Sequence, residues 1–329
     1  MAGPAKLCVL GAGAWGTALA IQAARAGLLV ALWARDPAQA TAIDAARENT
    51  RHLPGARLPP AITVTADARR ALAEAVLVVT AVPVQHLRAV LLAMPLRALP
   101  LVVVAKGVEA GTLKLPLEII ADLHPGCPAA ILSGPNFAHE VAAGLPAAAV
   151  VASRDAALRA RIADLLGSPA FRLYGGDDPV GVQVGGAAKN VIAIAAGAVI
   201  GAGLGENARA ALITRGVAEL SRLAVALGGR AETAAGLSGL GDLLLTATSP
   251  GSRNTSLGVE LGRGRTLVQA LAGRVGVAEG VATAPGLVAR AASVGVELPI
   301  CAAVSALLAG EVTVADAMGR LLARPRRDE

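Results

Sequence analysis

One lysine, Lys189, has a sequence environment that suits acid/base chemistry. It is the only charged side chain in residues 179–204 (PVGVQVGGAAKNVIAIAAGAVIGAGL), and residues 190–200 are apolar or small on every face, which is typical of a fully buried helix. We expect Lys189 in the interior, where an ammonium needs a partner or a lowered pKa. The alternative is a first-turn lysine whose head reaches water. The chain has only four lysines, and lysine, unlike arginine, can lose its proton near neutral pH, so its presence here favours proton transfer.

Residues 236–254 (GLSGLGDLLLTATSPGSRN) contain two further candidate groups. Asp242 stands alone among small and apolar residues and suits pairing with a lysine, or else it caps a helix. Ser252, Arg253 and Asn254 precede a predicted helix, where a guanidinium, a hydroxyl, an amide and backbone N–H groups together suit a phosphate. The alternative for this triplet is an ordinary N-cap beside an exposed arginine.

Two loops carry polar residues directly after predicted strands. The first is Ala105-Lys106-Gly107 and the second is residues 133–138, SGPNFA. Ligands of open α/β sheets lie at the carboxyl ends of strands, so these loops are candidate site residues. A surface lysine beside a helix is the alternative for Lys106.

The first 35 residues read as a complete βαβ unit. An apolar run at 6–10 leads into GAGAWG, with Gly11, Gly13 and Gly16 in dinucleotide-binding spacing, followed by a helix at 17–26 and a strand at 28–33. Ala34 stands where an acidic residue would hold the 2′-hydroxyl of NAD, and Arg35 suits a 2′-phosphate. NADP(H) is therefore favoured, while Asp36 keeps NAD(H) open.

The remaining pattern predicts an α/β fold with two domains. Short apolar runs at 62–65, 76–82, 101–105, 129–132 and 147–152 alternate with helical segments at 67–73, 86–93, 115–123 and 156–166, which indicates a Rossmann-type doubly wound parallel sheet. After residue 174 only helical periodicity remains. We expect a dinucleotide-binding domain at 1–179 and an all-helical substrate-binding and catalytic domain at 180–329, with the Lys189 helix lining the cleft between them.

Composition narrows the function class. The 329 residues are 54% hydrophobic and 2% aromatic with a net charge of +6, but the arginines are scattered and aromatic stacking platforms are lacking, which argues against nucleic acid. Three separated cysteines and four unclustered histidines predict a reducing cytoplasm and no metal site. Lys189 and glycines interrupt the longest apolar run, so we expect neither membrane insertion nor a targeting segment.

Several blocks together resemble the NAD(P)-dependent glycerol-3-phosphate dehydrogenases of the bacterial type. They are GAGAWGTALA, NTRHLPGARLP, AKGVE, LSGPNFAHEVAAGLP, GAAKNVIAIAAG, GLSGLGDLLLTATS, SRN and VAEGVATA, spread from residue 7 to about residue 285. The resemblance implies interconversion of sn-glycerol 3-phosphate and dihydroxyacetone phosphate, which supplies glycerol 3-phosphate for phospholipid synthesis.

The resemblance also implies roles for individual residues. Lys189 matches the proton acceptor. Independently of the resemblance, the chemistry suits Lys106 as a second catalytic cation, which would lower the pKa of Lys189 and polarise the developing carbonyl oxygen. The positions that match substrate contacts are Lys106, Gly134, Asn136, Lys189, Asp242, Ser252, Arg253 and Asn254. The glycine turn and positions that match dinucleotide contacts are Gly11, Gly13, Ala14, Trp15, Gly16, Arg35, Lys106, Ala138, Arg253, Val277 and Glu279. Ala14 departs from the serine of many members, so one hydrogen bond to the pyrophosphate would be missing.

Two other functions compete with this one. A dehydrogenase of hydroxy acids would share the nucleotide turn and the lysine, but the triplet 252–254 with Asp242 suits a phosphate better than a carboxylate. A non-catalytic NADP-sensing protein would be expected to have lost a lysine or the triplet. The apolar faces of the helical domain are compatible with a homodimer and with a monomer.

Overall fold

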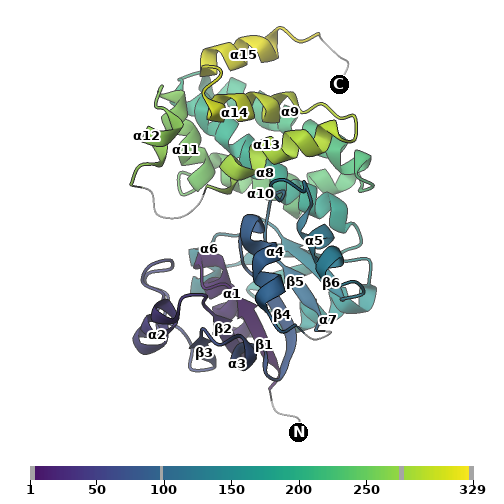
Figure 1. Ribbon diagram of the computed structural model, residues 1–329. Coiled ribbons are helices and arrows are strands. Elements are labelled where there is room, and N and C mark those ends of the chain that lie inside the picture. Colours follow the sequence, from purple (N-terminus) through teal and green to yellow (C-terminus); the bar gives the residue numbers. More distant parts are fainter. Residues whose placement is uncertain (1–3, 97–98, 274–277, 326–329) are drawn as a thin grey trace. The chain divides into compact units, whose positions relative to one another are not determined.

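The computed structural model describes residues 4–96, 99–273 and 278–325 (Figure 1). The chain divides into two compact units, which we call the sheet unit and the helical unit. The sheet unit comprises Met1–Lys106 and Leu115–Pro179, and the helical unit comprises Gly107–Lys114 and Val180–Glu329. Pro179 ends the second segment of the sheet unit, and the assignment of Gly107–Lys114 to the helical unit has no counterpart in the hydrophobic pattern.

The sheet unit contains one eight-stranded sheet with the order β3-β2-β1-β4-β5-β6-β7-β8. Its strands are β1 (Lys6–Leu10), β2 (Leu29–Trp33), β3 (Ile62–Thr65), β4 (Ala75–Thr80), β5 (Leu101–Val103), β6 (Ala129–Ser133), β7 (Ala147–Ala152) and β8 (Phe171–Gly176). Its helices are α1 (Ala14–Arg25), α2 (Pro37–Ala46), α3 (Ala68–Leu72), α4 (Val84–Ala93), α5 (Pro116–Leu123), α6 (Ala138–Ala143) and α7 (Ala156–Leu166).

Alternation along the strands explains why both faces of this sheet are covered. In β1, Leu7 and Val9 belong to a core cluster that also contains residues of α1, α6 and α7. Cys8 and Leu10, which point to the opposite face, are equally buried. A continuous apolar run is therefore needed, which is what the sequence shows at each inner strand.

The direction of the last strands corrects the expectation of a fully parallel sheet. β1 to β6 run parallel, but β7 pairs antiparallel with β6, and β8 pairs parallel with β7. A buried apolar run looks the same in either direction, so its hydrophobic pattern does not determine strand orientation. β8, α2 and α6 are also additional to the predicted elements. β8 lies at the sheet edge with three of its six residues exposed, and it lacks the apolar run of an inner strand.

The helical unit confirms the all-helical expectation over its described residues from 180 onward. Its α-helices are α8 (Pro179–Gly201), α9 (Gly205–Ala226), α10 (Asp242–Thr248), α11 (Arg253–Gly262), α12 (Leu267–Leu271), α13 (Glu279–Ala292), α14 (Pro299–Ala309) and α15 (Val314–Leu322). Between α9 and α10 lie a 3-10 helix, η1 (Glu232–Ala235), and a π-helical turn, η2 (Leu237–Gly241).

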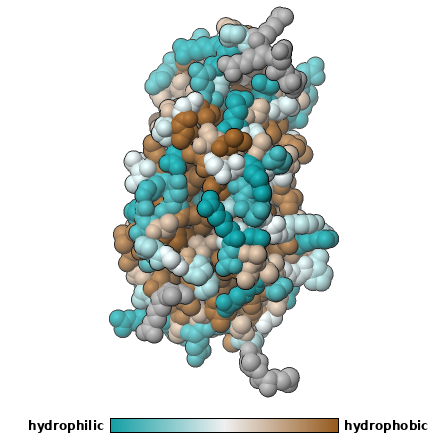
Figure 2. Space-filling model, turned by 90° about the vertical axis from the view of Figure 1, so that its right-hand side faces the viewer, coloured by the Kyte–Doolittle hydropathy of each residue, from teal (hydrophilic) through white to brown (hydrophobic). Residues whose placement is uncertain are grey.

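α8 is the central helix of this unit. It is long and apolar enough to cross a membrane, yet 89% of its most apolar stretch of 18 residues is buried inside the protein, as in the core helix of a globular domain. On the face drawn in Figure 2, hydrophilic residues are interspersed with apolar ones. The length of α8 is thus explained by packing among the other helices.

α8 and α11 approach each other through two interlocking pairs of glycines. A Cβ added to Gly197 or Gly201 of α8 would lie 2.1 Å from the carbonyl oxygens of Thr255 and Val259 in α11. Conversely, a Cβ at Gly258 or Gly262 would lie 2.0 or 2.3 Å from carbonyl oxygens of α8. Only glycine permits this backbone approach, so the four residues fix how α11 lies against α8.

Candidate active site

Lys189 is buried and paired, as its sequence environment predicts. Its side chain lies in the middle of α8, and the residue is 8% exposed, so the surface alternative is wrong. Nζ donates to Oδ1 of Asp242 at 2.7 Å and to Oγ1 of Thr246 at 2.9 Å. Asp242 is 1% exposed and pairs with a lysine, while the N-cap position of α10 is occupied by Gly241.

Glycines on both sides bring this pair together. Gly185, one helical turn before Lys189 on the same face of α8, would place a Cβ 2.7 Å from the carbonyl oxygen of Ser238 in η2. Gly239 is packed as tightly, because its Cβ would lie 2.1 Å from the carbonyl oxygen of Ala234. The π-helical turn therefore lies directly against α8, and the chain that follows it begins α10 with Asp242 facing Lys189.

Thr246 determines how protons are arranged around the pair. Its hydroxyl donates to the main-chain carbonyl of Asp242 at 2.6 Å, so its oxygen accepts from Lys189. An ammonium has three N–H donors, and this arrangement directs two of them at Asp242 and Thr246.

The triplet 252–254 begins α11 and divides into three different environments. Ser252 is the N-cap and accepts from the Thr255 amide at 3.2 Å, as the N-cap alternative predicts. Arg253 is exposed, and Asn254 is buried. The first N–H groups of a helix have no partner within it, so this end of α11 attracts anions.

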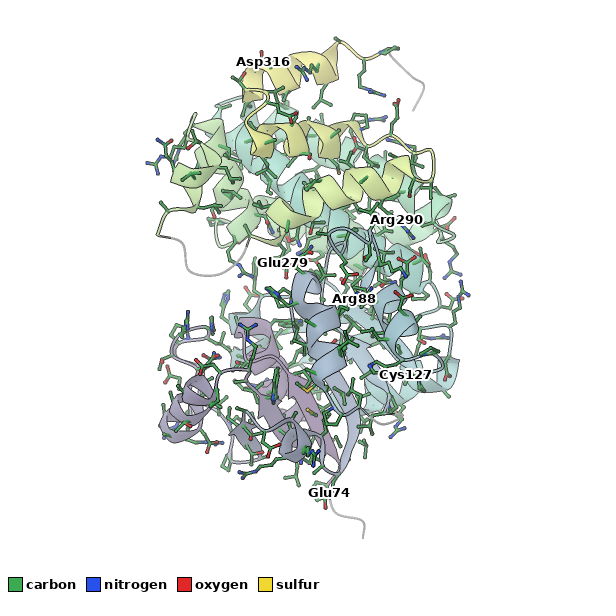
Figure 3. The ribbon with its side chains drawn as sticks, viewed as in Figure 1. Glu74, Arg88, Cys127, Glu279, Arg290 and Asp316 are labelled. Carbon is green, nitrogen blue, oxygen red and sulfur yellow. The ribbon has the colours of Figure 1, made fainter. Side chains whose placement is uncertain are left out.

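Asn254 belongs to a buried network of amides between α8, α11 and α13. Its Nδ2 donates to Oδ1 of Asn190 at 2.9 Å, and its Oδ1 accepts from the Gly280 amide at 3.1 Å. Asn190 in turn donates to Glu279 Oε2 at 3.2 Å. Figure 3 labels Glu279, at the start of α13. Asn190 is next to Lys189 in the chain, so the network connects a predicted dinucleotide contact with a predicted substrate contact.

In the sheet unit, the predicted substrate residues lie after β5 and β6. Lys106 follows β5 and is half-buried. Gly134 is buried, and a Cβ there would lie 2.9 Å from the Ala148 carbonyl oxygen. Asn136 donates to the same carbonyl at 3.1 Å, but its own Oδ1 and the Ser133 hydroxyl are buried without a hydrogen-bond partner among the described residues. Two such orphan groups at strand ends are typical of a ligand site.

The glycine turn between β1 and α1 has the geometry of a dinucleotide loop. Gly11 has φ +112°, which favours glycine, and a Cβ at Gly16 would lie 1.9 Å from the Gly11 carbonyl oxygen. Gly13 is the N-cap of α1 and opens onto free space, with no atom within 4 Å of a Cβ built there. Ala14 and Trp15, the next two residues, are half-buried. The helix end is thus accessible to a phosphate and fits the pyrophosphate of a dinucleotide.

The residues after β2 have different side-chain environments. Arg35 is exposed, whereas Asp36 is the N-cap of α2, and its Oδ1 accepts from the Ala38 amide at 2.9 Å. Ala38 follows Pro37, which occupies the first position of α2. Both residues are exposed, but the carboxylate of Asp36 is engaged by the backbone.

The other predicted cofactor residues are more dispersed. Ala138 is the first residue of α6 and is half-buried. Val277 lies outside the described residues. Asn190, Thr246 and Ser133 are additional to the residues singled out from the sequence; of these, Thr246 alone has a readable signal, because it follows Asp242 by four residues and shares its helix face.

A dinucleotide-binding turn and a buried lysine–carboxylate pair in one chain define an NAD(P)-dependent dehydrogenase. Two family descriptions match it: NAD-dependent glycerol-3-phosphate dehydrogenase N-terminus over residues 6–159, and the C-terminus of the same family over residues 178–319. The chain belongs to the NAD-dependent glycerol-3-phosphate dehydrogenase family. Its predicted family and fold class are thereby confirmed.

Individual relatives agree with this membership. Glycerol-3-phosphate dehydrogenase [NAD(P)+] of Caulobacter vibrioides is 56% identical over 272 residues, which is 82% of each chain. The enzyme of the same name from Rhodospirillum rubrum is 54% identical over 274 residues, covering 82% of this chain and 78% of the relative. The crystal structure of glycerol-3-phosphate dehydrogenase from Coxiella burnetii has a TM-score of 0.93 at 35% identity and covers 98% of this chain and 99% of that one.

Proposed function

We propose that this protein interconverts sn-glycerol 3-phosphate and dihydroxyacetone phosphate with NADP(H) as its preferred cofactor, and that Lys189 carries the proton. The observation that carries the proposal is the buried contact of Lys189 with Asp242 and Thr246. A lysine surrounded by apolar helix residues and oriented by two partners is suited to exchange one proton with a substrate hydroxyl.

In the oxidative direction, neutral Lys189 takes the proton of the C2 hydroxyl. The resulting ammonium is stabilised by the Asp242 carboxylate at 2.7 Å, and Thr246 keeps Nζ oriented. In the reductive direction, the same ammonium returns the proton to the developing alkoxide. When bound, the nicotinamide ring supplies the hydride acceptor or donor.

We propose substrate contacts for each unit separately. In the sheet unit, Lys106 would polarise the carbonyl oxygen, and the orphan Oδ1 of Asn136, beside Gly134, would accept from a substrate hydroxyl. In the helical unit, Arg253 and the first N–H groups of α11 would bind the phosphate. Ser252 would support this phosphate site by capping α11. Asn254 holds the first turn of α11 to α8 through Asn190.

The dinucleotide would be held by the turn from Gly11 to Gly16, with the pyrophosphate at the N-terminus of α1. Arg35 would bind a 2′-phosphate, and the engagement of Asp36 as a helix cap supports the preference for NADP(H) over NAD(H). Lys106, Ala138, Arg253, Val277 and Glu279 are proposed as further contacts. Supply of glycerol 3-phosphate for phospholipid synthesis, a cytoplasmic location and a homodimer belong to the same proposal.

The first experiment follows nicotinamide absorbance with purified protein, in parallel with NADPH and NADH. The substrates are dihydroxyacetone phosphate and dihydroxyacetone, which lacks the phosphate. We expect oxidation of the nicotinamide cofactor that requires the phosphorylated substrate and is faster with NADPH than with NADH. Arg35→Leu should abolish the difference between the two cofactors. Absence of oxidation with either cofactor, despite measurable cofactor binding, would refute the proposed reaction.

A further inference from the structure

Asn49, in the segment between α2 and β3, connects that segment to the glycine turn. The residue is 1% exposed. Its Nδ2 donates to the Ala12 carbonyl at 2.9 Å and to Thr17 Oγ1 at 2.8 Å, and its Oδ1 accepts from the His52 amide at 3.3 Å. Gln39 donates to the same Ala12 carbonyl over a longer distance of 3.4 Å. The Asn49 amide therefore connects the glycine turn to the first helical turn of α1.

The bond to Ala12 fixes the direction of a neighbouring donor. In a trans peptide the C=O and the following N–H point in opposite directions. Because the Ala12 carbonyl points to Asn49, the Gly13 N–H points away from it. Gly13 is the N-cap of α1 and opens onto free space, so this N–H is one of those that would meet a pyrophosphate.

The orientation of the Ala12–Gly13 peptide needs such a hydrogen bond, because glycine does not restrict the backbone by itself. Rotation of the Ala12–Gly13 peptide changes ψ of Ala12 and φ of Gly13, and glycine at position 13 readily adopts conformations that other residues avoid. Rotation of this one peptide would replace an N–H by a carbonyl oxygen facing the anion. The hydrogen bond from the buried Asn49 amide opposes that rotation, since the rotated peptide would take away the acceptor of one Nδ2–H.

We infer that Asn49 is a positioning residue for the dinucleotide, which orients the Ala12–Gly13 peptide so that its N–H faces the pyrophosphate. The inference rests on the dinucleotide site of the proposed function. It assigns Asn49 no contact with substrate or cofactor, and it predicts an effect on cofactor affinity rather than on proton transfer.

The test is Asn49→Asp, which keeps the shape but places a carboxylate oxygen against the Ala12 carbonyl or the Thr17 hydroxyl oxygen. We expect the dissociation constant and KM for NADPH to rise by roughly tenfold or more, as loss of a buried hydrogen bond implies. The kcat at saturating NADPH and the KM for dihydroxyacetone phosphate should stay within about twofold of wild type. Asn207→Asp, with the same charge change on an exposed part of α9, is the matched control and should alter none of these.

A second ligand separates positioning from general damage to the sheet unit. Adenosine 2′-phosphate lacks the pyrophosphate, so its affinity should be unchanged by Asn49→Asp and reduced by Arg35→Leu. Two results would overturn the inference. One is that Asn49→Asp lowers the affinities for NADPH and for adenosine 2′-phosphate equally, and the other is that its NADPH affinity stays within about threefold of wild type. If Asn49→Asp does not fold, Thr17→Val should raise the KM for NADPH and Thr17→Ser should restore it; no effect of Thr17→Val would then overturn it. Wild-type protein that binds neither ligand would instead refute the dinucleotide site itself.

Discussion

Lys189 of α8 and Asp242 of α10 form a buried ion pair, 2.7 Å between Nζ and Oδ1, across 53 residues of sequence. Removing one partner leaves the other charge buried without this counter-charge. We expect Lys189→Met to lower the free energy of unfolding of the helical unit by about 3–5 kcal/mol, and the double variant Lys189→Met/Asp242→Asn to recover most of it. In both variants we expect turnover to be lower than in wild type by roughly two to four powers of ten, without loss of cofactor affinity. Full turnover in either variant would contradict the assignment of Lys189.

Asp36 provides a test of the ribose site that is independent of Arg35. Since its carboxylate caps α2 through the Ala38 amide, Asp36→Ala should cost about 1 kcal/mol of stability. Asp36→Asn, which can still cap, should cost less. The ratio of kcat/KM for NADPH to that for NADH should be unchanged in both variants. A ratio that rises in both variants would show that the carboxylate contacts the ribose instead.

The sequence predicts much of the fold because its signals are local. The βαβ unit around Gly11–Gly16 can be read from glycine spacing, and the buried environment of Lys189 from the absence of other charged groups in residues 179–204. The strand β8 is missed because it lies at the exposed edge of the sheet. The direction of β7 is missed because a buried apolar run has the same hydrophobic pattern in a parallel and in an antiparallel strand. The amide contacts of Asn49 and Asn254 depend on tertiary distances that no local pattern encodes. The roles of the individual site residues remain predictions.

The glycines between α8 and α11 should be intolerant of even one methyl group. Because a Cβ at Gly258 would lie 2.0 Å from the Ile194 carbonyl oxygen, Gly258→Ala should destabilise the helical unit by about 1–3 kcal/mol or more. The matched control is Gly319 of α15, which has no atom within 4 Å of such a Cβ. There, Gly319→Ala should stabilise by about 0.5–1 kcal/mol. Urea unfolding followed by circular dichroism measures both, and equal effects of the two substitutions would contradict the close packing.

Glu219 of α9 predicts a pH dependence of stability. It is 3% exposed and accepts from the Ile300 and Cys301 amides at 2.6 and 3.2 Å, at the N-terminus of α14. Burial raises the pKa of this carboxyl above its usual value, although the two backbone hydrogen bonds lower it in part. A raised pKa means that the folded protein holds the proton more tightly than the unfolded chain. The stabilisation is therefore complete below the unfolded pKa of about 4.3 and is lost as the pH rises through the folded pKa.

Comparison with Glu219→Gln isolates this group, because the glutamine does not titrate and all other groups contribute equally to both proteins. We expect the stability of wild type relative to Glu219→Gln to increase as the pH is lowered from 7 to 5. Both tryptophans, Trp15 and Trp33, lie in the sheet unit, so the helical unit is best followed by circular dichroism. The exposed Glu311→Gln serves as control and should show no such trend. A stability difference that is constant or decreases toward pH 5 would mean that Glu219 is held by its two amide donors mainly as the carboxylate.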